Sequence, residues 1–236
     1  LDIQETRFPI DPYVLGVWLG DGDSSGARIT YCLDELQIVE NLEACGMKVS
    51  KGTKDKRSNA VSSGIEFANL DKSTCYRGHL WSENESKSSK GRCLACERMT
   101  DHARRYGLPI PPSQVRGFKA TLRSIGVIGN KHIPPMYLRG SEYQRMALLQ
   151  GLMDTDGFIS AGQGQCEFTT TSDLLRGGFL ELARSLGYKP TVMTARATID
   201  GRDCGEKYRI QFMAYADRPV FRLPRKAARL RTRPAT

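Results

Sequence analysis

The chain has 236 residues, of which 39% are hydrophobic and 26% are charged, and these proportions exclude a disordered or fibrous protein. No apolar run reaches the roughly 20 residues that cross a bilayer, and no charged-then-apolar leader is present, so we expect a cytoplasmic protein. Lys and Arg number 35 against 26 Asp and Glu, a net charge of +9, which favours a polyanionic partner, nucleic acid before membrane.

A nine-residue motif occurs twice in the chain, and each copy is predicted to form a helix that ends at the motif's last residues. The first copy, VLGVWLGDG, spans residues 14–22, and the second, LQGLMDTDG, spans residues 149–157. Small residues four apart, such as Gly16 and Gly20, lie on one helical face and allow close approach, so we predict that the two helices pack against each other. We also predict that the final Gly of each copy caps its helix with a positive φ.

Each copy carries an Asp at the C-terminal end of its predicted helix. Free carbonyl oxygens and the negative end of the helix dipole gather there, so nothing favours an anion unless a cation binds. Two packed helices would bring Asp21 and Asp156 together as hard oxygen ligands, which indicates a Mg²⁺-type site. For a single copy, a helix cap is the simpler interpretation, and two copies in register favour the metal site.

Short strands and helices follow each copy of the motif. Helical periodicity predicts helices over residues 34–45 and 173–186. Residue alternation predicts strands over residues 26–33, 64–70, 164–171, 191–199 and 207–215. The polar faces of these strands are suited to reading DNA bases, and they carry Arg28, Thr30, Gln165, Glu167, Thr169, Arg196, Thr198, Arg209 and Gln211.

Three of the seven cysteines gather with a histidine between the two motif copies. Cys75 and His79 form one close pair, and Cys93 and Cys96 form a second pair after a polar loop. Two pairs of soft ligands at this spacing are typical of a tetrahedral Zn²⁺ site, and four protein ligands would make the metal structural. The alternative is a set of thiols and an imidazole without a metal.

The odd number of cysteines favours reduced thiols over a disulfide framework. We expect residues 73–105 to form a zinc-finger insertion, with Arg77 and Arg92 among the basic residues that contact DNA phosphates.

The last segment, residues 218–236, contains seven basic residues and no acidic one. Two interpretations are open. The segment is either a solvated linker or tail, or a contact to DNA through residues such as Arg222 and Arg225. Its apolar residues favour partial docking, with a helix over residues 225–231.

The paired nonamers resemble the two motifs of the LAGLIDADG homing endonucleases, in the variety carried within inteins. The stretch GNKHIPP at residues 129–135 and the stretch VFRL at residues 220–223 support this resemblance. It implies an α+β fold, namely a pseudo-twofold monomer of two αββαββα halves with the motif helices at their interface. A long antiparallel sheet of each half would lie in the DNA major groove.

The resemblance also implies a division of the chain. The first half would begin with residues 1–72 and be interrupted by the zinc finger at residues 73–105. Residues 106–140 would contain the remainder of the first half and the linker. The second half would span residues 141–217, before the basic tail of residues 218–236.

The function implied by the resemblance is site-specific cleavage of double-stranded DNA. Such an enzyme hydrolyses phosphodiesters of a long asymmetric target with Mg²⁺. Carried over residue by residue, Asp21 and Asp156 are the catalytic metal ligands, and the main-chain carbonyls of Gly20 and Thr155 assist them.

Family members usually also place a Lys near each centre. Candidates in the first half are Lys51 and Lys54, and Arg196 stands where the second Lys is expected.

Other functions remain open. The same scaffold is compatible with a DNA-binding regulator or an RNA maturase that has lost nuclease activity. A zinc-stabilised interaction module without a nucleic-acid partner conflicts with the basic tail. Leu1 is not a splicing nucleophile, and the chain does not end in the His-Asn pair of an intein. We therefore expect a piece of a larger intein precursor that does not splice by itself.

Overall fold

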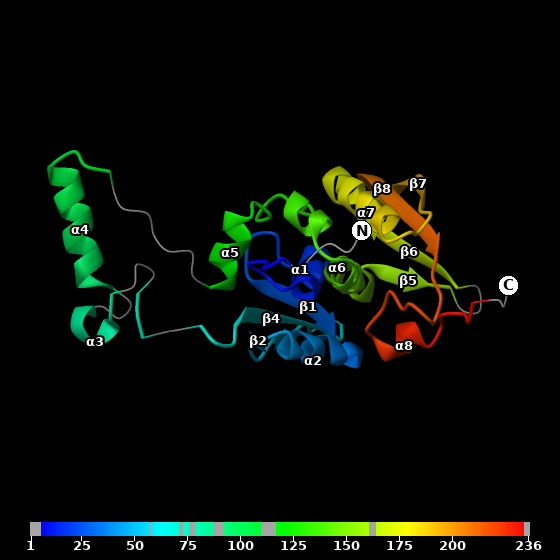
Figure 1. Cartoon of the computed structure of the whole chain (residues 1–236), viewed down its shortest axis with the longest axis horizontal. Helices are drawn as coiled ribbons and strands as arrows, with labels where there is room; N and C mark the ends of the chain where they lie inside the picture. The colour runs from blue at the N-terminus through cyan, green and yellow to red at the C-terminus, as the bar shows by residue number, and fades with distance from the viewer. Residues whose placement is uncertain are drawn as a thin grey trace.

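The structure is a computed structural model with an α+β fold, and it describes residues 6–56, 58–70, 73–75, 79–86, 92–109, 117–160 and 164–233. Helices α1 (Pro12–Asp21) and α6 (Glu142–Thr155) lie side by side at its centre, with one four-stranded sheet on each side (Figure 1). Within the described residues, no helix is long and apolar enough to cross a membrane.

The predicted packing of the two motif helices is confirmed. A Cβ atom on Gly16 would overlap the main-chain oxygen of Leu148, and one on Gly151 would overlap that of Tyr13. In both cases the obstacle is backbone, which cannot move without displacing its helix. Only Gly therefore permits this approach, and the close contact offsets the roughly 1 kcal/mol by which a helical Gly is less favourable than Ala.

We expect Gly16→Ala to lower the free energy of unfolding by about 1–3 kcal/mol, the usual cost of overpacking a dense interface. The matched control is Gly177→Ala in α7 (Asp173–Ser185), where an added Cβ meets nothing within 4 Å. That change should stabilise the protein by up to about 1 kcal/mol through helix propensity. Urea unfolding measures both, and equal effects would contradict the tight interface.

The prediction that each motif ends in a left-handed Gly cap is wrong. Gly22 has φ −75°. Gly157 is the first residue of strand β5 (Gly157–Ile159) and is not among the glycines with positive φ. A Cβ on Gly22 would overlap the main-chain oxygen of Trp18, and one on Gly157 would overlap that of Met153. The chain folds back over each helix end, so close approach is what requires Gly here.

The first sheet is built around one central strand. After α1 come β1 (Arg28–Cys32), the 3₁₀ turn η1 (Leu33–Glu35), α2 (Gln37–Ala44), β2 (Met47–Val49), β3 (Thr53–Lys54) and β4 (Ala60–Phe67). Strand β4 pairs antiparallel with β1, β2 and β3. The predicted helix and first strand are present with shorter bounds, whereas β4 begins four residues before the strand predicted at 64–70.

The second sheet has the strand order β5-β6-β8-β7. Its further elements are β6 (Gln165–Thr170), α7, β7 (Thr191–Ile199) and β8 (Arg202–Met213), followed by α8 (Pro224–Ala227). Helix α7 covers one face of the sheet, because Phe179 stacks on Phe168 with ring centroids 4.2 Å apart. The predicted helix and strands are present, and β8 begins earlier than predicted.

The insertion contains α3 (Trp81–Asn84) and α4 (Leu94–Arg105), which lie apart from both sheets (Figure 1). Helix α5 (Phe118–Ser124) and the 3₁₀ turn η2 (Pro135–Arg139) then lead back to α6. Ser141 and Gln144 form a capping box that starts α6.

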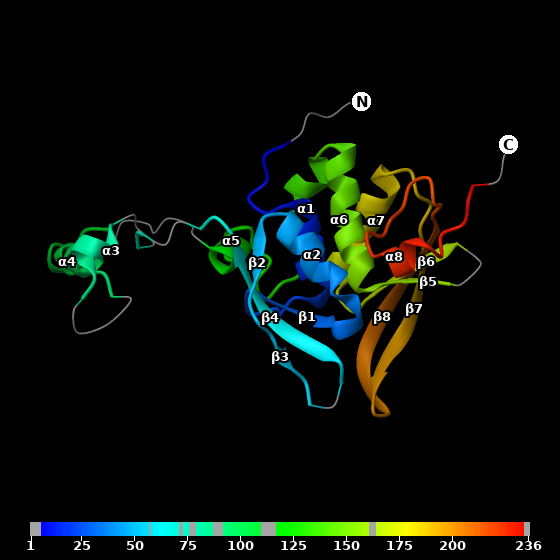
Figure 2. The ribbon, with the colours of Figure 1, turned by 90° about the horizontal axis from the view of Figure 1, so that it is seen from below.

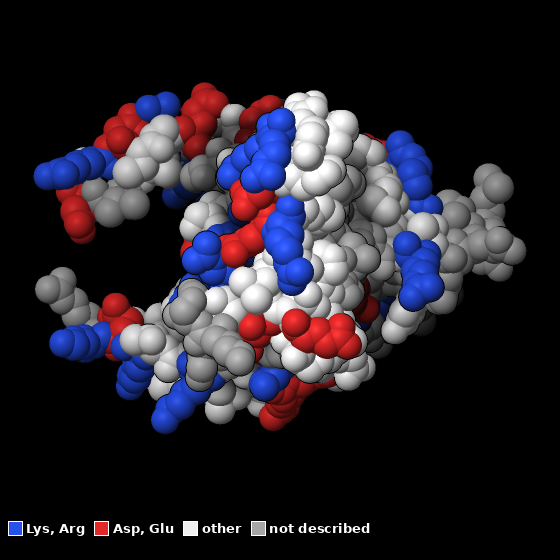
Figure 3. Space-filling model, turned by 90° about the vertical axis from the view of Figure 1, so that its left-hand side faces the viewer, with Lys and Arg blue, Asp and Glu red and all other residues white. Residues whose placement is uncertain are grey.

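Two strand pairs project from the same side of the molecule. The β3–β4 and β7–β8 pairs extend beyond the central helices, and α6 runs toward that side (Figure 2). The space-filling view shows a hollow between two projecting arms, which carry both Lys and Arg and Asp and Glu (Figure 3). We call this side of the molecule the hairpin face.

The basic C-terminal segment is docked on the protein over residues 218–233. Val220, Phe221 and Leu223 are at most 2% exposed. Helix α8 is shorter than the predicted helix over 225–231, since it ends at Ala227. The interpretation as a solvated linker is wrong for this segment, because its apolar side chains belong to the core.

Candidate active site

The structure brings the two motif aspartates to the same end of the central helix pair. Asp21 is the last residue of α1, and Asp156 is the C-cap of α6. A Cβ on Gly20 would lie 3.4 Å from Oδ2 of Asp156. The Asp156 carboxylate therefore reaches across the interface to the end of α1, so atoms from both motif copies meet there.

Both aspartates have raised pKa values. Asp21 is half-buried, and burial followed by the charge of Asp156 raises its pKa to about 6. Asp156 is more exposed, but nearby protein atoms displace enough water to raise its pKa as well. The positive charges of Lys131 and Lys226 lower the pKa of both carboxylates and so oppose this effect. A site that holds two carboxylates this close favours an added cation.

Lys131 holds the end of α1. Its Nζ donates to the main-chain oxygen of Gly20 at 2.8 Å and lies 5.4 Å from the ring centroid of Trp18. Burial lowers the pKa of this ammonium group, and Asp156 and Asp21 raise it in turn. Sequence reasoning missed Lys131 as a site residue, although it lies in the stretch 129–135 that supported the family resemblance.

Lys226 holds the end of α6. Its Nζ donates to four main-chain oxygens at 2.7–3.3 Å, those of Met153, Asp154, Thr155 and Gly157. An ammonium group has three protons, so these contacts use all of its donors on carbonyls at the end of the helix. Burial lowers the pKa of Lys226 to about 8. Sequence reasoning treated this residue only as part of a basic tail.

The carbonyls proposed as assisting metal ligands therefore each have a Lys partner. Gly20 O accepts from Lys131, and Thr155 O accepts from Lys226. A carbonyl oxygen has two lone pairs, so each keeps capacity for a second partner.

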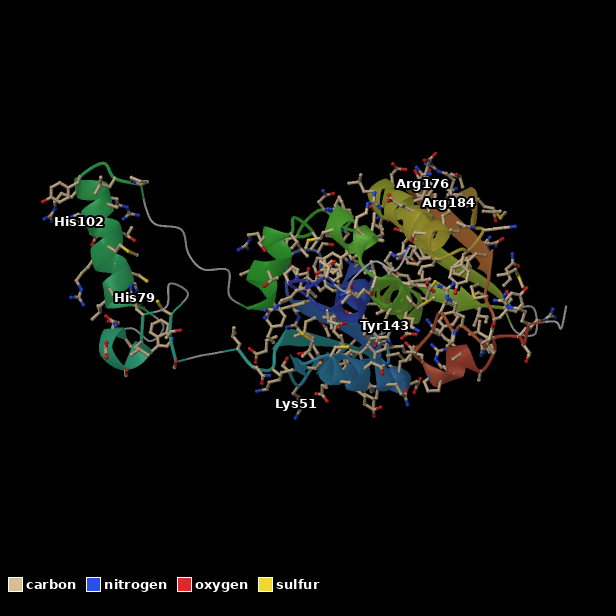
Figure 4. All side chains as sticks on the ribbon, in the orientation of Figure 1. Lys51, His79, His102, Tyr143, Arg176 and Arg184 are labelled. Carbon is tan, nitrogen blue, oxygen red and sulfur yellow. The ribbon has the colours of Figure 1, made fainter. Side chains whose placement is uncertain are left out.

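The lysines suggested from the sequence lie elsewhere. Lys54 is exposed on β3, and Lys51 lies at the edge of the molecule, away from the central helices (Figure 4). Arg196 on β7 forms an ion pair with Asp203 on β8. The side chains that act electrostatically on the two aspartates are Lys131 and Lys226 instead.

A cavity of about 530 Å³ opens beside Asp156. It is lined by the ends of both motif helices, the stretch around Lys131, the end of β6 and Lys207 on β8. Hydroxyl, ammonium and carboxylate groups all reach this space, so it is suited to a hydrated cation and a phosphate group.

A connected polar network covers the sheet face opposite α7. Glu167 accepts from Arg209 Nε at 2.8 Å and Nη2 at 2.7 Å, and from Gln211 Nε2 at 2.7 Å. Gln165 in turn donates to Gln211 at 3.0 Å. These hydrogen bonds lower the pKa of Glu167. Arg209 and Gln211, which were predicted to read bases, are therefore held in place by Glu167. They are two positions apart on β8 and so lie on the same face of the sheet, as predicted.

Other predicted DNA contacts have internal partners. Arg28 donates to the main-chain oxygen of Ser62 on β4 at 2.9 Å. Arg225 pairs with Glu35. Arg92 in the insertion pairs with Glu97. Arg77 lies outside the described residues.

The backbone N–H of Arg222 bonds to Asp154 near the C-terminal end of α6, but its guanidinium points toward the N-terminal ends of the motif helices. Its guanidinium is 4.1 Å from the ring centroid of Tyr13, and its Nε donates to Gln150 at 2.9 Å. It lines a cavity with Asp11 and Tyr143, at the N-terminal ends of α1 and α6. The structure therefore directs this guanidinium away from the hairpin face.

The four predicted ligands in the insertion come together. The ligand atoms of Cys75, His79, Cys93 and Cys96 all lie within 4.8 Å of one another. This cluster is on the insertion, and the Asp pair is on the central helices, so the two sites are separate.

One known domain family matches part of the chain. Residues 143–209 match the LAGLIDADG-like domain family, a range that includes the second motif and most of the second sheet. The chain is 31% identical over 227 residues to the replicative DNA helicase DnaB of Mycobacterium intracellulare. This match covers 96% of the chain and 27% of the helicase, so the chain spans about a quarter of that relative.

Solved structures that match this chain include two LAGLIDADG proteins. The homing endonuclease I-DmoI in complex with DNA and Ca is 12% identical with a TM-score of 0.40, over 92% of this chain and 94% of that one. The N-terminal LAGLIDADG domain of DUF199/WhiA is 10% identical with a TM-score of 0.39, over 89% of this chain and 80% of that one.

Proposed function

We propose that this protein is a site-specific double-strand DNA endonuclease of the LAGLIDADG homing type, which hydrolyses phosphodiesters in a long asymmetric target with Mg²⁺. The observation that carries this proposal is the meeting of Asp21 and Asp156 at adjacent helix ends, on the side toward which α6 and the hairpins extend. The match to the LAGLIDADG-like domain supports the same family.

The donor set fits Mg²⁺. Carboxylate and carbonyl oxygens are the hard ligands that this ion prefers, and Asp21 and Asp156 would hold it with help from Gly20 and Thr155. Bound there, the ion would supply Lewis-acid polarisation of the phosphate and activation of water. Lys131 places a positive charge at the cavity wall and so favours a phosphate group beside the aspartates.

The hairpin face would bind the DNA. The polar network of the second sheet presents Arg209 and Gln211, and β1 presents Arg28, all residue types that read base edges in a major groove. Arg196 lies on the β7–β8 pair that projects toward the same side. The net charge of +9 would add attraction to the phosphates independent of sequence.

We propose that two related halves form this site in a monomer, with the division given by the resemblance. The two lysines support the relation. Lys131 bonds to Gly20 across 111 positions of the sequence, and Lys226 bonds to Thr155 across 71. The first interval is longer because it contains the insertion between residues 73 and 105. Each half thus uses a Lys beyond its sheet to hold its own motif helix.

The relation to a helicase supports an intein origin. Almost the whole chain aligns with a minor part of that protein, as expected when the related segment is embedded in a longer polypeptide. The chain would then be the endonuclease portion of a larger precursor.

The decisive experiment uses a plasmid that carries the DNA target, namely the gene of the proposed precursor with the coding sequence of the intein removed and the two flanking sequences joined. We expect linear product with Mg²⁺ and none with EDTA. A mobility-shift measurement on the same duplex separates the alternatives. Sequence-specific binding without cleavage in Mg²⁺ would contradict the endonuclease and favour a DNA-binding regulator.

A further inference from the structure

The Cys/His cluster of the insertion has the dimensions of an occupied metal site. Nδ1 of His79 lies 3.5 Å from Sγ of Cys75, 3.6 Å from that of Cys93 and 3.4 Å from that of Cys96. Sγ of Cys75 lies 3.5 Å from Sγ of Cys96. With Zn–S near 2.3 Å and Zn–N near 2.0–2.1 Å, a tetrahedron has S···N edges of about 3.5 Å and S···S edges of about 3.8 Å. These four separations lie within about 0.3 Å of the ideal edges, and all four ligand atoms lie within 4.8 Å of one another.

The local backbone presents the ligands in two pairs. Cys75 N–H donates to the main-chain oxygen of His79 at 2.8 Å, which holds the two residues of the first pair together. Cys93 is the N-cap of α4, and Cys96 lies in its first turn. The positive end of the helix dipole there stabilises thiolate, the form of cysteine that binds metals.

Apolar packing alone is too small to hold this segment. The buried part of the insertion cluster consists of Cys75, Cys93 and Cys96, joined only by the half-buried Trp81 and Ala95 among the described residues. This cluster is separate from the main core. Folding this segment costs conformational entropy, and the burial of so few apolar side chains does not offset that cost. Another source of stability is therefore needed.

We propose that the insertion binds one structural Zn²⁺ through Cys75 Sγ, His79 Nδ1, Cys93 Sγ and Cys96 Sγ, and that this metal folds the insertion. Three thiolates and an imidazole select Zn²⁺ over hard cations such as Mg²⁺. Four protein ligands leave no open position for substrate, so the ion is not catalytic. His79 lies beside the start of α4, while His102 lies toward its far end (Figure 4). His102 is therefore not a ligand.

Metal analysis of the full chain tests this proposal without DNA, so its outcome is independent of the endonuclease assignment. We expect one zinc per chain in the purified protein. The double variant Cys93→Ser/Cys96→Ser should lose it, and the control Cys32→Ser/Cys204→Ser, outside the cluster, should keep it. His79→Cys should retain zinc through a fourth thiolate, whereas His79→Ala should bind it more weakly.

A second measurement examines folding. Removal of zinc by a chelator should expose the insertion to limited proteolysis, while the main thermal transition of the two halves stays unchanged because they have their own core. Zinc retained in the Cys93/Cys96 double variant would overturn the proposal. Purified protein that contains no metal and whose cysteines are found to be joined in a disulfide would also overturn it. The same holds if limited proteolysis cuts the insertion equally slowly with and without the metal.

Discussion

Replacing Asp21 or Asp156 by Asn is expected to lower double-strand cleavage by at least about 100-fold while the protein stays folded. An amide keeps the shape of the side chain but removes the charge that would hold the cation, and losses of this size follow removal of one group that stabilises a transition state. Stability should not fall, because each change removes one of two neighbouring negative charges. Plasmid linearisation in Mg²⁺ measures the loss.

The control for this prediction is Asp23→Asn. Asp23 follows Asp21 by two positions, but it is exposed and accepts from the backbone and hydroxyl of Ser25 within its own turn. This variant should cleave normally. DNA affinity, measured by mobility shift in EDTA, should stay within a few-fold of the unchanged protein for all three variants. Equal cleavage by the Asp21 and Asp23 variants would refute the assignment.

The second large effect is expected at Asp154, two positions before Asp156. This residue is 0% exposed. Its carboxylate accepts from Tyr13 Oη at 2.8 Å and from the backbone N–H groups of Arg222 and Leu223 at 3.0 and 3.1 Å. Asp154→Ala leaves these donors without an acceptor, and each unsatisfied buried group costs about 1–3 kcal/mol. We expect a total loss of about 3–5 kcal/mol in the free energy of unfolding.

Urea unfolding measures this loss, and limited proteolysis reports whether the C-terminal segment is released. Tyr13→Phe is the matched control, since it removes one hydroxyl and leaves both N–H groups bonded to Asp154. It should cost only about 1 kcal/mol. If the two variants lose the same stability, Asp154 does not hold the C-terminal segment. The contrast with Asp156→Asn separates a structural carboxylate from a proposed catalytic one on the same helix end.

The repeat made the central helix pair predictable from the sequence. Small residues four apart and an Asp at a fixed place are local patterns, and two copies in register indicate where the helices meet. The prediction that the final Gly of each motif copy has a positive φ was wrong. A single sequence does not reveal whether a Gly is needed for a positive φ or for close approach of the backbone. Strands β2 and β3, of three and two residues, are too short to show any alternation.

The two lysines at the site could not be derived from spacing. Lys131 and Lys226 bond to main-chain oxygens, which every residue carries, so their acceptors leave no mark in the sequence. They also lie far along the chain from the helices that they hold. Likewise, the contact between Asp154 and the C-terminal segment joins a carboxylate to backbone N–H groups. The sequence indicated a basic segment that is partly docked through its apolar residues, but not this contact with Asp154.

The Asp154 contact would give the two proposed halves different and complementary roles. When the two motif copies are aligned, Leu19 of the first copy stands opposite Asp154 of the second. Tyr13, the residue that donates to Asp154, directly precedes the first copy, and the residue that precedes the second copy is Leu148. In a dimer of two identical second halves joined through α6, each Asp154 would face Leu148 in place of Tyr13. It would then lack the hydroxyl donor that Tyr13 supplies. Two identical first halves would lack the carboxylate altogether. The two proposed halves would therefore not be interchangeable. A symmetric homodimer built from either of them would lose a buried acceptor or its donor at the interface of α1 and α6.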